Sequence, residues 1–432
     1  MQYFYILIVT LFISGCNISN GVNVQKVTDL QKVSQDVQTY TKGIDAGYIS
    51  TLQNYKYYYF KPWNIEKIQA PLAEAMWAYK VFTPQKSYGE NLQKIDQSFF
   101  DAMLDNSNFS EYASLNKPAL TLKHLNLRAF PTQRPLLRDP KLAGEGFPFD
   151  YLQNSTIAAN KPILVSHYSK DRAWVFVESS FAHGWVNSND IVYLSSKERE
   201  IWQQVTQVFF TKDNVPLYDS KNNFLFKSHI GMMLPLIDTN ETDNIVLSVS
   251  KYANNRAYFH RSILSKEVTH QGILKFNAKN IDIIINELQK VNYGWGGMYG
   301  QRDCSSTMRD FFAPFGVWLP RNSYTQSRVG RVIALDKMSD KEKIAAIKKY
   351  GVAFRTLLYK KGHIVLYAGT LNDKVIVFQN LWGIKTLKYN KAGRFIIGRP
   401  IFSTLEVGEN LRYYDKSASL LSNLKSMNII TF

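Results

Sequence analysis

The sequence predicts an α+β fold in which a helical N-terminal segment, two small β-barrels and a mixed C-terminal domain follow one another. The chain has 432 residues, more than a single hydrophobic core usually holds. Helical periodicity dominates residues 28–120, short β-branched and aromatic runs fill residues 121–270, and helices followed by strands occupy residues 271–432. With 45% hydrophobic and 20% charged residues, the composition is that of a folded chain and excludes a disordered one.

The first sixteen residues resemble a bacterial lipoprotein signal. An apolar run over residues 3–13 is too short to span a bilayer but suits a signal-peptide core, although no Lys or Arg precedes it. Ser14 and Gly15 give a signal peptidase access, after which the Cys16 thiol can be diacylated. Residues 17–27 are polar and are expected to form a tether. We therefore expect an exported, membrane-anchored chain.

The segment from 28 to 120 is expected to form a helical N-terminal domain. Residues 70–79 and 91–104 carry the apolar spacing of helices, and Pro71 would fall in a first turn, where proline is tolerated. No residue of this segment suggests chemistry.

Residues 121–196 and 197–270 predict two successive small β-barrels of similar design. Runs such as 163–167, 174–177 and 245–249 are rich in valine, isoleucine and aromatic residues and are separated by turn residues. Loosely similar aromatic and proline positions recur in the two blocks, which favours a repeat.

The C-terminal region, 271–432, begins with two predicted helices separated by a glycine-rich loop. Residues 280–291 have helical apolar spacing, and Tyr293-Gly-Trp-Gly-Gly297 cannot continue the helix. A second helix is expected to start at Asp303-Cys304, because Met308, Phe311, Phe312 and Phe315 form one apolar stripe that ends at Gly316.

Cys304 is the candidate nucleophile. The chain has two cysteines, so lipidation of Cys16 would leave Cys304 as a free thiol in an oxidising compartment. At a helix N-terminus, the backbone N–H groups and the helix dipole favour a thiolate. We therefore expect the pKa of Cys304 to lie below the usual value of about 8.5.

His363 is the candidate base, and Gln379 the residue that orients it. His363 heads a buried apolar run, Asn372-Asp373 marks a turn, and a second apolar run follows. Folding this hairpin symmetrically about Leu371 places Gln379 opposite His363, where its amide oxygen can accept the imidazole N–H. A slip of one residue would turn Gln379 to the other face.

These pieces together resemble the NlpC-type peptidases, papain-like enzymes that hydrolyse peptidoglycan stem peptides. The resemblance covers the last 160 or so residues. It rests on five pieces in the right order: Tyr293-Gly-Trp-Gly-Gly297, Asp303-Cys-Ser-Ser306, Leu319-Pro-Arg-Asn-Ser323, Gly362-His-Ile-Val-Leu-Tyr-Ala-Gly369 and Gln379-Asn-Leu-Trp-Gly383. The whole chain is similar to the multidomain subgroup with two SH3-like barrels before the peptidase domain.

The resemblance implies hydrolysis of the γ-D-glutamyl–diamino acid bond by Cys304 and His363, with the backbone N–H of Cys304 in the oxyanion hole. Gln379 departs from the histidine expected at its position. It can orient but cannot carry charge, so an altered pH profile is expected. Trp295, Asp303, Ser305 and Ser323 match substrate-lining positions. Each also has a structural alternative: loop packing for Trp295, helix capping for Asp303 and Ser305, and a turn for Ser323.

The predicted partners follow from charge and from the signal segment. The net charge of +17 is spread along the chain without a nucleic-acid-binding motif, so it predicts a solvated surface or attraction to peptidoglycan carboxylates or anionic lipid. No metal-ligand spacing or phosphate loop is present, so no cofactor is expected. We expect a monomer that acts on muropeptides and is anchored on the periplasmic face of the outer membrane, since the residue after Cys16 is not aspartate.

Two other functions fit the same sequence. One is an amidase or acyltransferase that uses the same thiol, and the other is a non-catalytic cell-wall-binding lipoprotein. If the peptidase function holds, a barrel that closes one end of the groove would favour stems with a free L-alanine amine. Asp303, Glu145 and Asp150 are the carboxylates expected to meet that amine.

Overall fold

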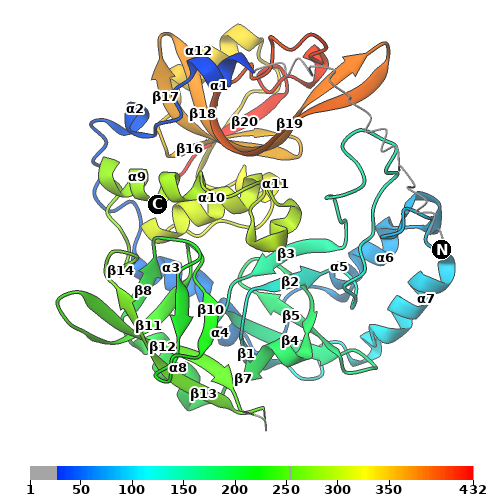
Figure 1. Ribbon diagram of the computed structural model, residues 1–432, viewed down its shortest axis with the longest axis vertical. Coiled ribbons are helices and arrows are strands. Elements are labelled where there is room, and N and C mark those ends of the chain that lie inside the picture. Colours follow the sequence, from blue (N-terminus) through cyan, green and yellow to red (C-terminus); the bar gives the residue numbers. More distant parts are fainter. Residues whose placement is uncertain (1–26, 253–254, 432) are drawn as a thin grey trace, which may run out of the picture.

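The computed structural model describes residues 27–252 and 255–431. The signal segment and Cys16 lie outside these residues. Figure 1 shows the six-stranded sheet of the C-terminal region on one side and the two barrels on the other, with helices between them. The predicted α+β class, with its helical segment, two barrels and mixed C-terminal domain, is confirmed. No helix among the described residues is long and apolar enough to cross a membrane.

The N-terminal helical segment is more broken than its periodicity predicts. The predicted helix at 70–79 is two short helices that meet at Met76, and the one at 91–104 starts only after Asp96. Its buried side chains are shared among several hydrophobic cores, because Val37 packs in the C-terminal region, Tyr59 against the second barrel and Phe100 beside the first. The α-helices are α1 Thr28–Lys32, α2 Gln38–Thr41, α3 Leu52–Tyr59, α4 Lys61–Asn64, α5 Leu72–Ala75, α6 Trp77–Val81 and α7 Gln97–Asn106.

The first barrel is a seven-stranded sheet in the order β3-β2-β6-β5-β4-β1-β7. Its interior is filled by alternating apolar residues such as Leu127, Val165 and Val186. A long loop between β2 and β3, residues 129–152, leaves the barrel toward the C-terminal region. The strands are β1 Lys117–Thr121, β2 Leu125–Arg128, β3 Gln153–Ile157, β4 Pro162–Tyr168, β5 Trp174–Ser179, β6 His183–Asn187 and β7 Ile191–Tyr193.

The second barrel follows α8, Ser196–Gln204, which begins with a capping box between Ser195 and Glu198. A five-stranded sheet in the order β13-β12-β11-β8-β14 is completed by the β9–β10 pair. Phe209 and Phe210 are fully buried between these sheets and α3. The strands are β8 Gln207–Phe210, β9 Pro216–Tyr218, β10 Phe224–Lys227, β11 Met233–Thr239, β12 Asp243–Lys251, β13 Ala257–Ser265 and β14 Thr269–Gln271.

The C-terminal region packs α9, Ala278–Leu288, and α10, Cys304–Phe312, against an antiparallel sheet. The predicted stripe on α10 is buried in that core, Pro314 falls in a 3-10 turn, and Gly316 ends the segment at φ 78°. The sheet order is β15-β20-β16-β17-β18-β19. The other elements are α11 Ser323–Gln326, β15 Arg331–Ala334, α12 Asp340–Tyr350, β16 Thr356–Lys360, β17 His363–Leu371, β18 Lys374–Lys388, β19 Lys391–Thr404 and β20 Leu424–Ile429.

Candidate active site

Cys304 is the first residue of α10. The Asp303 carboxylate caps the helix by accepting from the Ser306 backbone N–H at 2.8 Å, and the Ser306 hydroxyl accepts from the Asp303 N–H. The Cys304 side chain is buried, with 8% of the residue exposed. Position 304 therefore has the helix-start geometry that the sequence predicts.

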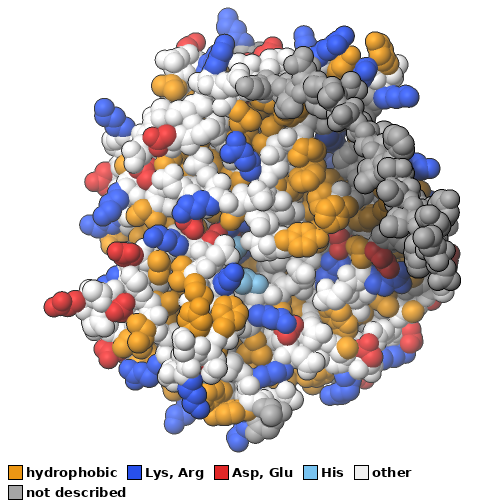
Figure 2. All heavy atoms as spheres, viewed as in Figure 1, with side chains coloured by type: hydrophobic (Ala, Val, Ile, Leu, Met, Phe, Trp, Pro, Cys, Tyr) orange, Lys and Arg blue, Asp and Glu red, His pale blue; other side chains and the backbone are white. Residues whose placement is uncertain are grey.

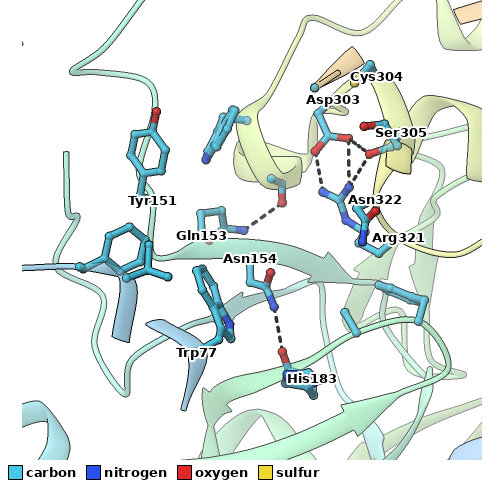
Figure 3. A pocket seen from close by; sticks show the side chains of 18 of the residues that line it. Trp77, Tyr151, Gln153, Asn154, His183, Asp303, Cys304, Ser305, Arg321 and Asn322 are labelled. Carbon is cyan, nitrogen blue, oxygen red and sulfur yellow. Dashed lines mark hydrogen bonds and ion pairs between the residues drawn. The ribbon is translucent and has the colours of Figure 1, made fainter. Parts of the chain in front are cut away.

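A pocket of about 810 Å³ opens beside Cys304 and is walled by three parts of the chain. The N-terminal helices contribute Glu74 and Trp77, the first barrel contributes Tyr151 and His183, and the C-terminal region contributes the thiol. Figure 3 shows Trp77, Tyr151, His183 and Cys304 around the pocket, with Arg321 beside Asp303. The remaining lining residues are Val81, Phe82, Arg138, Gln153, Asn154, Phe181, Ala182, Tyr293, Trp295, Gly296, Asp303, Ser305, Arg321, Asn322, Ser323 and Gly362.

The glycine-rich loop before α10 presses directly against the first barrel. Gly296 and Gly297 have φ values of 58° and 82°, which favour glycine. A Cβ at Gly296 would lie 2.6 Å from the Gln153 carbonyl oxygen, and one at Gly297 would lie 2.4 Å from Thr156 Oγ1. The Gln153 amide also donates to the Gly296 carbonyl at 3.2 Å. The two glycines therefore fix the barrel as one wall of the pocket.

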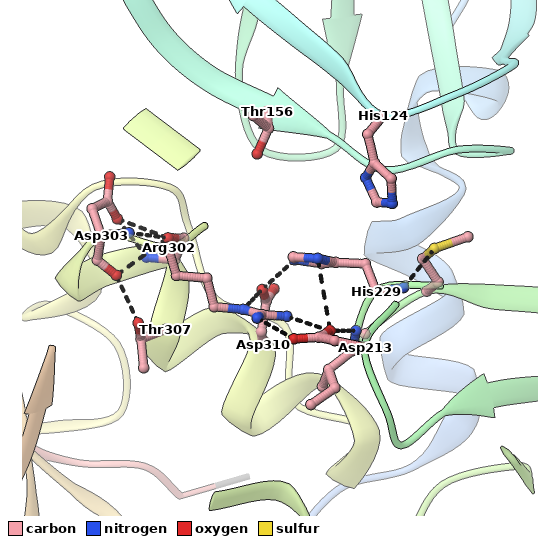
Figure 4. Close-up of polar contacts among 12 residues, drawn as sticks. His124, Thr156, Asp213, His229, Arg302, Asp303, Thr307 and Asp310 are labelled. Carbon is pink, nitrogen blue, oxygen red and sulfur yellow. Dashed lines mark hydrogen bonds and ion pairs between the residues drawn. The ribbon is translucent and has the colours of Figure 1, made fainter. Parts of the chain in front are cut away.

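A buried charge network holds the start of α10 against the second barrel (Figure 4). The Arg302 guanidinium, which is fully buried, forms ion pairs with Asp213 of the barrel and, at 2.6 Å, with Asp310 of α10. His229 Nε2 lies 2.8 Å from the second of these carboxylates. The Asn380 side chain donates to the Arg302 carbonyl at 2.7 Å. Arg302 thus ties the second barrel, α10 and β18 together two residues before the thiol.

His363 and Gln379 are brought together as the sequence predicts. The imidazole Nε2–H donates to Gln379 Oε1 at 2.8 Å, and the Gln379 amide donates to Ser403 Oγ at 2.7 Å. This second bond orients the glutamine, so the acceptor oxygen faces the imidazole. With its proton on Nε2, His363 keeps the lone pair of Nδ1 free to accept a proton.

The predicted hairpin register is wrong by two residues, although the predicted contact forms. The turn centres on Asn372 and Asp373, both at positive φ, and Leu371 pairs with Lys374. A bulge follows, and Leu366 then pairs with Phe378, so Gln379 is not directly opposite His363. A shift of two residues keeps a side chain on the same face of the sheet, which is why the hydrogen bond survives.

The prediction that Cys304 is a thiolate is wrong for the resting site. Burial, and after it the adjacent Asp303 carboxylate, raise the pKa of the thiol to about 12. The backbone N–H groups of Ile364 and Ser305 and the Arg321 guanidinium lower it by less. Desolvation therefore outweighs the helix start.

The imidazole is also neutral at rest. Burial lowers the pKa of His363 to about 4, and the Lys360 ammonium lowers it too, while the hydrogen bond to Gln379 raises it. The Ile364 backbone N–H reaches toward the sulfur, so the thiol lies beside the start of β17, the strand that begins with His363. The resting site therefore combines a protonated thiol with a neutral imidazole.

Asp303 and Ser305 line the pocket, but their polar atoms are already engaged. Arg321 Nη2 donates to Asp303 Oδ2 at 2.6 Å, and Nη1 donates to Ser305 Oγ at 2.9 Å. Asp150 forms a buried ion pair with Arg128, and Glu145 accepts from the Tyr151 hydroxyl. Each of these carboxylates therefore already has a partner within the chain, and their contact with a substrate ammonium stays a prediction.

Trp295 and Ser323 also line the pocket. The indole N–H of Trp295 donates to the Asp150 carbonyl at 2.9 Å, and its ring packs edge-on against Phe149. Trp295 therefore supports the loop that closes the pocket as well as facing it. Ser323 starts the short helix α11.

Several pocket residues are not predicted by the sequence. Glu74 and Trp77, for example, lie in the helical segment, where no chemistry is expected, and Arg321 is predicted only as part of a motif. Arg321 has a signal in its residue type, because arginine is enriched where a carboxylate is held by two hydrogen bonds. Among the described residues, no group of three His, Cys, Asp or Glu side chains could hold a metal ion.

Four family models match the chain in order. They are an NLPC_P60 stabilising N-terminal domain at residues 5–112, an SH3 domain of SH3b1 type at 135–187, an SH3 domain of SH3b2 type at 195–241, and the NlpC/P60 family at 290–389. No curated protein sequence matches the chain.

One solved structure shares this architecture over most of its length. An NlpC/P60 endopeptidase from Photobacterium damselae subsp. piscicida superposes with a TM-score of 0.81 at 21% identity, covering 92% of this chain and 98% of that one. An NlpC/P60 family protein from Bacillus cereus has a TM-score of 0.46 at 16% identity, covering 72% and 99%. The first of these shows that the fold of the whole chain has been seen before. The chain thus carries an NlpC/P60 family domain at residues 290–389, preceded in sequence order by matches to the NLPC_P60 stabilising domain and two SH3 domains.

Proposed function

We propose that the protein cleaves the γ-D-glutamyl–diamino acid bond of peptidoglycan stem peptides, with Cys304 as nucleophile, His363 as base and Gln379 as the residue that orients the base. The family supports a cell-wall peptidase. The observation that carries the proposal is the 2.8 Å hydrogen bond that fixes the His363 tautomer. His363 begins the strand whose Ile364 N–H reaches the thiol, and the thiol opens on the pocket.

The chemistry follows from the neutral resting pair. The Cys304 thiol gives its proton to His363 Nδ1 as the sulfur attacks the carbonyl carbon. The backbone N–H of Cys304, at the first position of α10, has no acceptor within the helix and can donate to the developing oxyanion. The intermediate collapses when His363 returns the proton to the leaving amine, and water then hydrolyses the thioester with His363 as base.

Product analysis tests this proposal against the other chemistry of a papain-like thiol. Incubation of the protein with L-alanyl-γ-D-glutamyl-diaminopimelate stems should release an L-alanyl-D-glutamate dipeptide and a product with a free diaminopimelate amine. An amidase would instead free the whole stem from muramic acid, and an acyltransferase would need an acceptor amine. A binding module would leave every substrate intact.

We further propose that the pocket prefers stems with a free L-alanine amine and that Glu74 meets this ammonium. Trp77, Tyr151 and His183 form walls of the pocket on the side away from the thiol. The pocket therefore has room for only a few substrate residues before the scissile bond. Asp303 and Glu74 are the carboxylates among its lining residues, and Asp303 is held by Arg321. Glu74, whose carboxylate is exposed on α5, is thus the available partner for the positively charged amine.

Acetylating the stem amine is expected to lower kcat/KM by about 10- to 100-fold, which is the worth of one hydrogen bond to a charged group. Glu74→Gln should lower the rate on free-amine stems by a similar factor and leave the rate on acetylated stems unchanged. Glu66→Gln, an exposed change in the same segment but outside the pocket, is the matched control. Equal wild-type rates on free-amine and amide-linked stems would indicate an open-groove endopeptidase instead.

The proposed location is the periplasmic face of the outer membrane, with the protein anchored as a monomer through lipid on Cys16. Labelling with radioactive palmitate should mark the wild-type chain and not the Cys16→Ala variant. A wild-type chain that stays unlabelled and freely soluble would contradict the anchor.

A further inference from the structure

The end of the β18–β19 hairpin is strongly basic and partly apolar. Residues 374–404 contain six Lys and Arg side chains and no carboxylate. Beyond its pairing with β17, which ends at Phe378, the hairpin continues for ten more residues along β18 and projects from the domain (Figure 1). At its end Tyr389 is 84% exposed and Leu387 43% exposed, and Ile396, which pairs with Gly383 farther from the turn, is 52% exposed.

Cations surround these apolar side chains. Lys388 and Lys391 flank the turn, and Lys388 Nζ lies 5.7 Å from the centre of the Tyr389 ring. Figure 2 shows Lys and Arg side chains and a hydrophobic group together at the upper right, over the end of this hairpin. The adjoining segment supplies Glu406, Glu409 and Asp415, of which Asp415 is paired with Lys385 at 3.0 Å.

The described chain begins beside the same hairpin. The Thr28 backbone N–H donates to Asn410 Oδ1 at 3.0 Å, Asp29 accepts from the Thr404 N–H at 2.7 Å, and Val27 packs in one cluster with Ile384. Eleven residues, 17–27, separate Cys16 from this point. A fully extended chain of that length reaches about 35 to 40 Å, so a lipid on Cys16 would hold the hairpin within that distance of a bilayer.

From this placement we propose that the β18–β19 hairpin is a membrane-contact surface that binds anionic lipid headgroups through Lys388 and Lys391 and inserts Tyr389 and Leu387 at the interface. Lysines attract an anionic leaflet, and tyrosine favours the headgroup level because its ring is apolar and its hydroxyl polar. A wall polymer would satisfy the charges but would gain less from exposed leucine and isoleucine. This membrane contact would orient the C-terminal domain relative to the bilayer. It does not depend on the proposed reaction.

Vesicle binding by the unlipidated chain from residue 17 onward, which retains every described residue, tests the proposal. It should bind phosphatidylcholine vesicles that contain phosphatidylglycerol, release them in high salt, and ignore pure phosphatidylcholine. Removal of each lysine should weaken binding about fivefold. The double variant Lys388→Glu/Lys391→Glu, which also reverses both charges, should therefore weaken binding by about 30-fold or more. Tyr389→Ser should weaken it less and independently of salt. Lys221→Glu/Lys341→Glu, which reverses two exposed charges elsewhere, is the matched control.

Circular dichroism and the melting temperature should be unchanged in all these variants, because the altered side chains are exposed. Equal binding by the hairpin variant and the control variant would overturn the proposal, as would a wild-type chain that does not distinguish anionic from neutral vesicles. Hairpin-dependent binding to purified sacculi with no binding to vesicles would overturn it in favour of a wall-polymer contact.

Discussion

Replacing Cys304 by alanine or serine is expected to lower the rate of stem-peptide hydrolysis by about 10⁴-fold or more, because the nucleophile of such a site acts as a unit with its base. The fold should remain, since the helix cap is formed by Asp303 and Ser306 and either substitute is accepted at the first position of a helix. The measurement is single-turnover cleavage of a free-amine stem, with the melting temperature of each variant as the control. His363→Ala should behave in the same way.

The state of the thiol can be followed independently of turnover. With its pKa raised to about 12, Cys304 should react slowly with iodoacetamide near neutral pH. The rate should rise about tenfold for each pH unit as the thiolate fraction grows. Activity that persists in both Cys304 variants would remove the thiol from the mechanism. Fast alkylation at neutral pH would instead show that the resting site holds a thiolate.

Removing the Arg302 guanidinium is expected to be the most damaging structural change. Arg302→Met leaves Asp213 and Asp310 buried without their cation, and the expected loss in the free energy of unfolding is about 3 to 5 kcal/mol. The comparison is Arg261→Met, whose pair with Asp238 spans 3.8 Å with both side chains about 60% exposed. That change should cost no more than about 1 kcal/mol. Urea denaturation of the two variants measures the difference.

The same network predicts how stability changes with pH. Burial raises the pKa of Asp213 and of Asp310, but the charges of Arg302 and His229 and the hydrogen bonds to each carboxylate together outweigh it and leave both below the ordinary value of an aspartate. An aspartate whose pKa is lower in the folded than in the unfolded chain stabilises the fold. This stabilisation is fully present above the pKa in the unfolded chain, about 3.9, and is lost as the pH falls below that value. Arg302→Met should abolish this acid dependence, and replacing both aspartates by asparagine in that variant should restore part of the stability. An Arg302→Met chain as stable as the Arg261→Met chain would show that the network contributes nothing.

Local pattern was enough to predict the centre of the site. The stripe on α10 has a period that only a buried helix produces, so the start of that helix and the position of Cys304 follow from the residues nearby. The contact of His363 with Gln379 was predicted for a similar reason, because an error of two residues in a hairpin leaves the side chains on their faces. An error of one residue would have lost the contact.

The walls and the electrostatics of the site depend on contacts between distant residues, which local pattern does not carry. Glu74 lies 230 positions before Cys304, and no periodicity links a short helix to a pocket in another domain. Asp213 and Arg302 meet across a domain interface in the same way. The error in the thiol pKa has this origin too, because a helix start is visible in the sequence whereas the burial that overrides it is a tertiary property.

Keeping Cys304 protonated has a consequence for the lifetime of the protein. Peroxide attacks thiolates, and each step from sulfenic to sulfonic acid begins with that attack. A buried thiol whose pKa is raised to about 12 offers almost no thiolate near neutral pH, and the described residues contain no second cysteine that could form a disulfide with it. The proton that must leave during catalysis thus also shields the sulfur between turnovers. A chain exposed to oxidants would therefore stay active without a reductase to repair this cysteine.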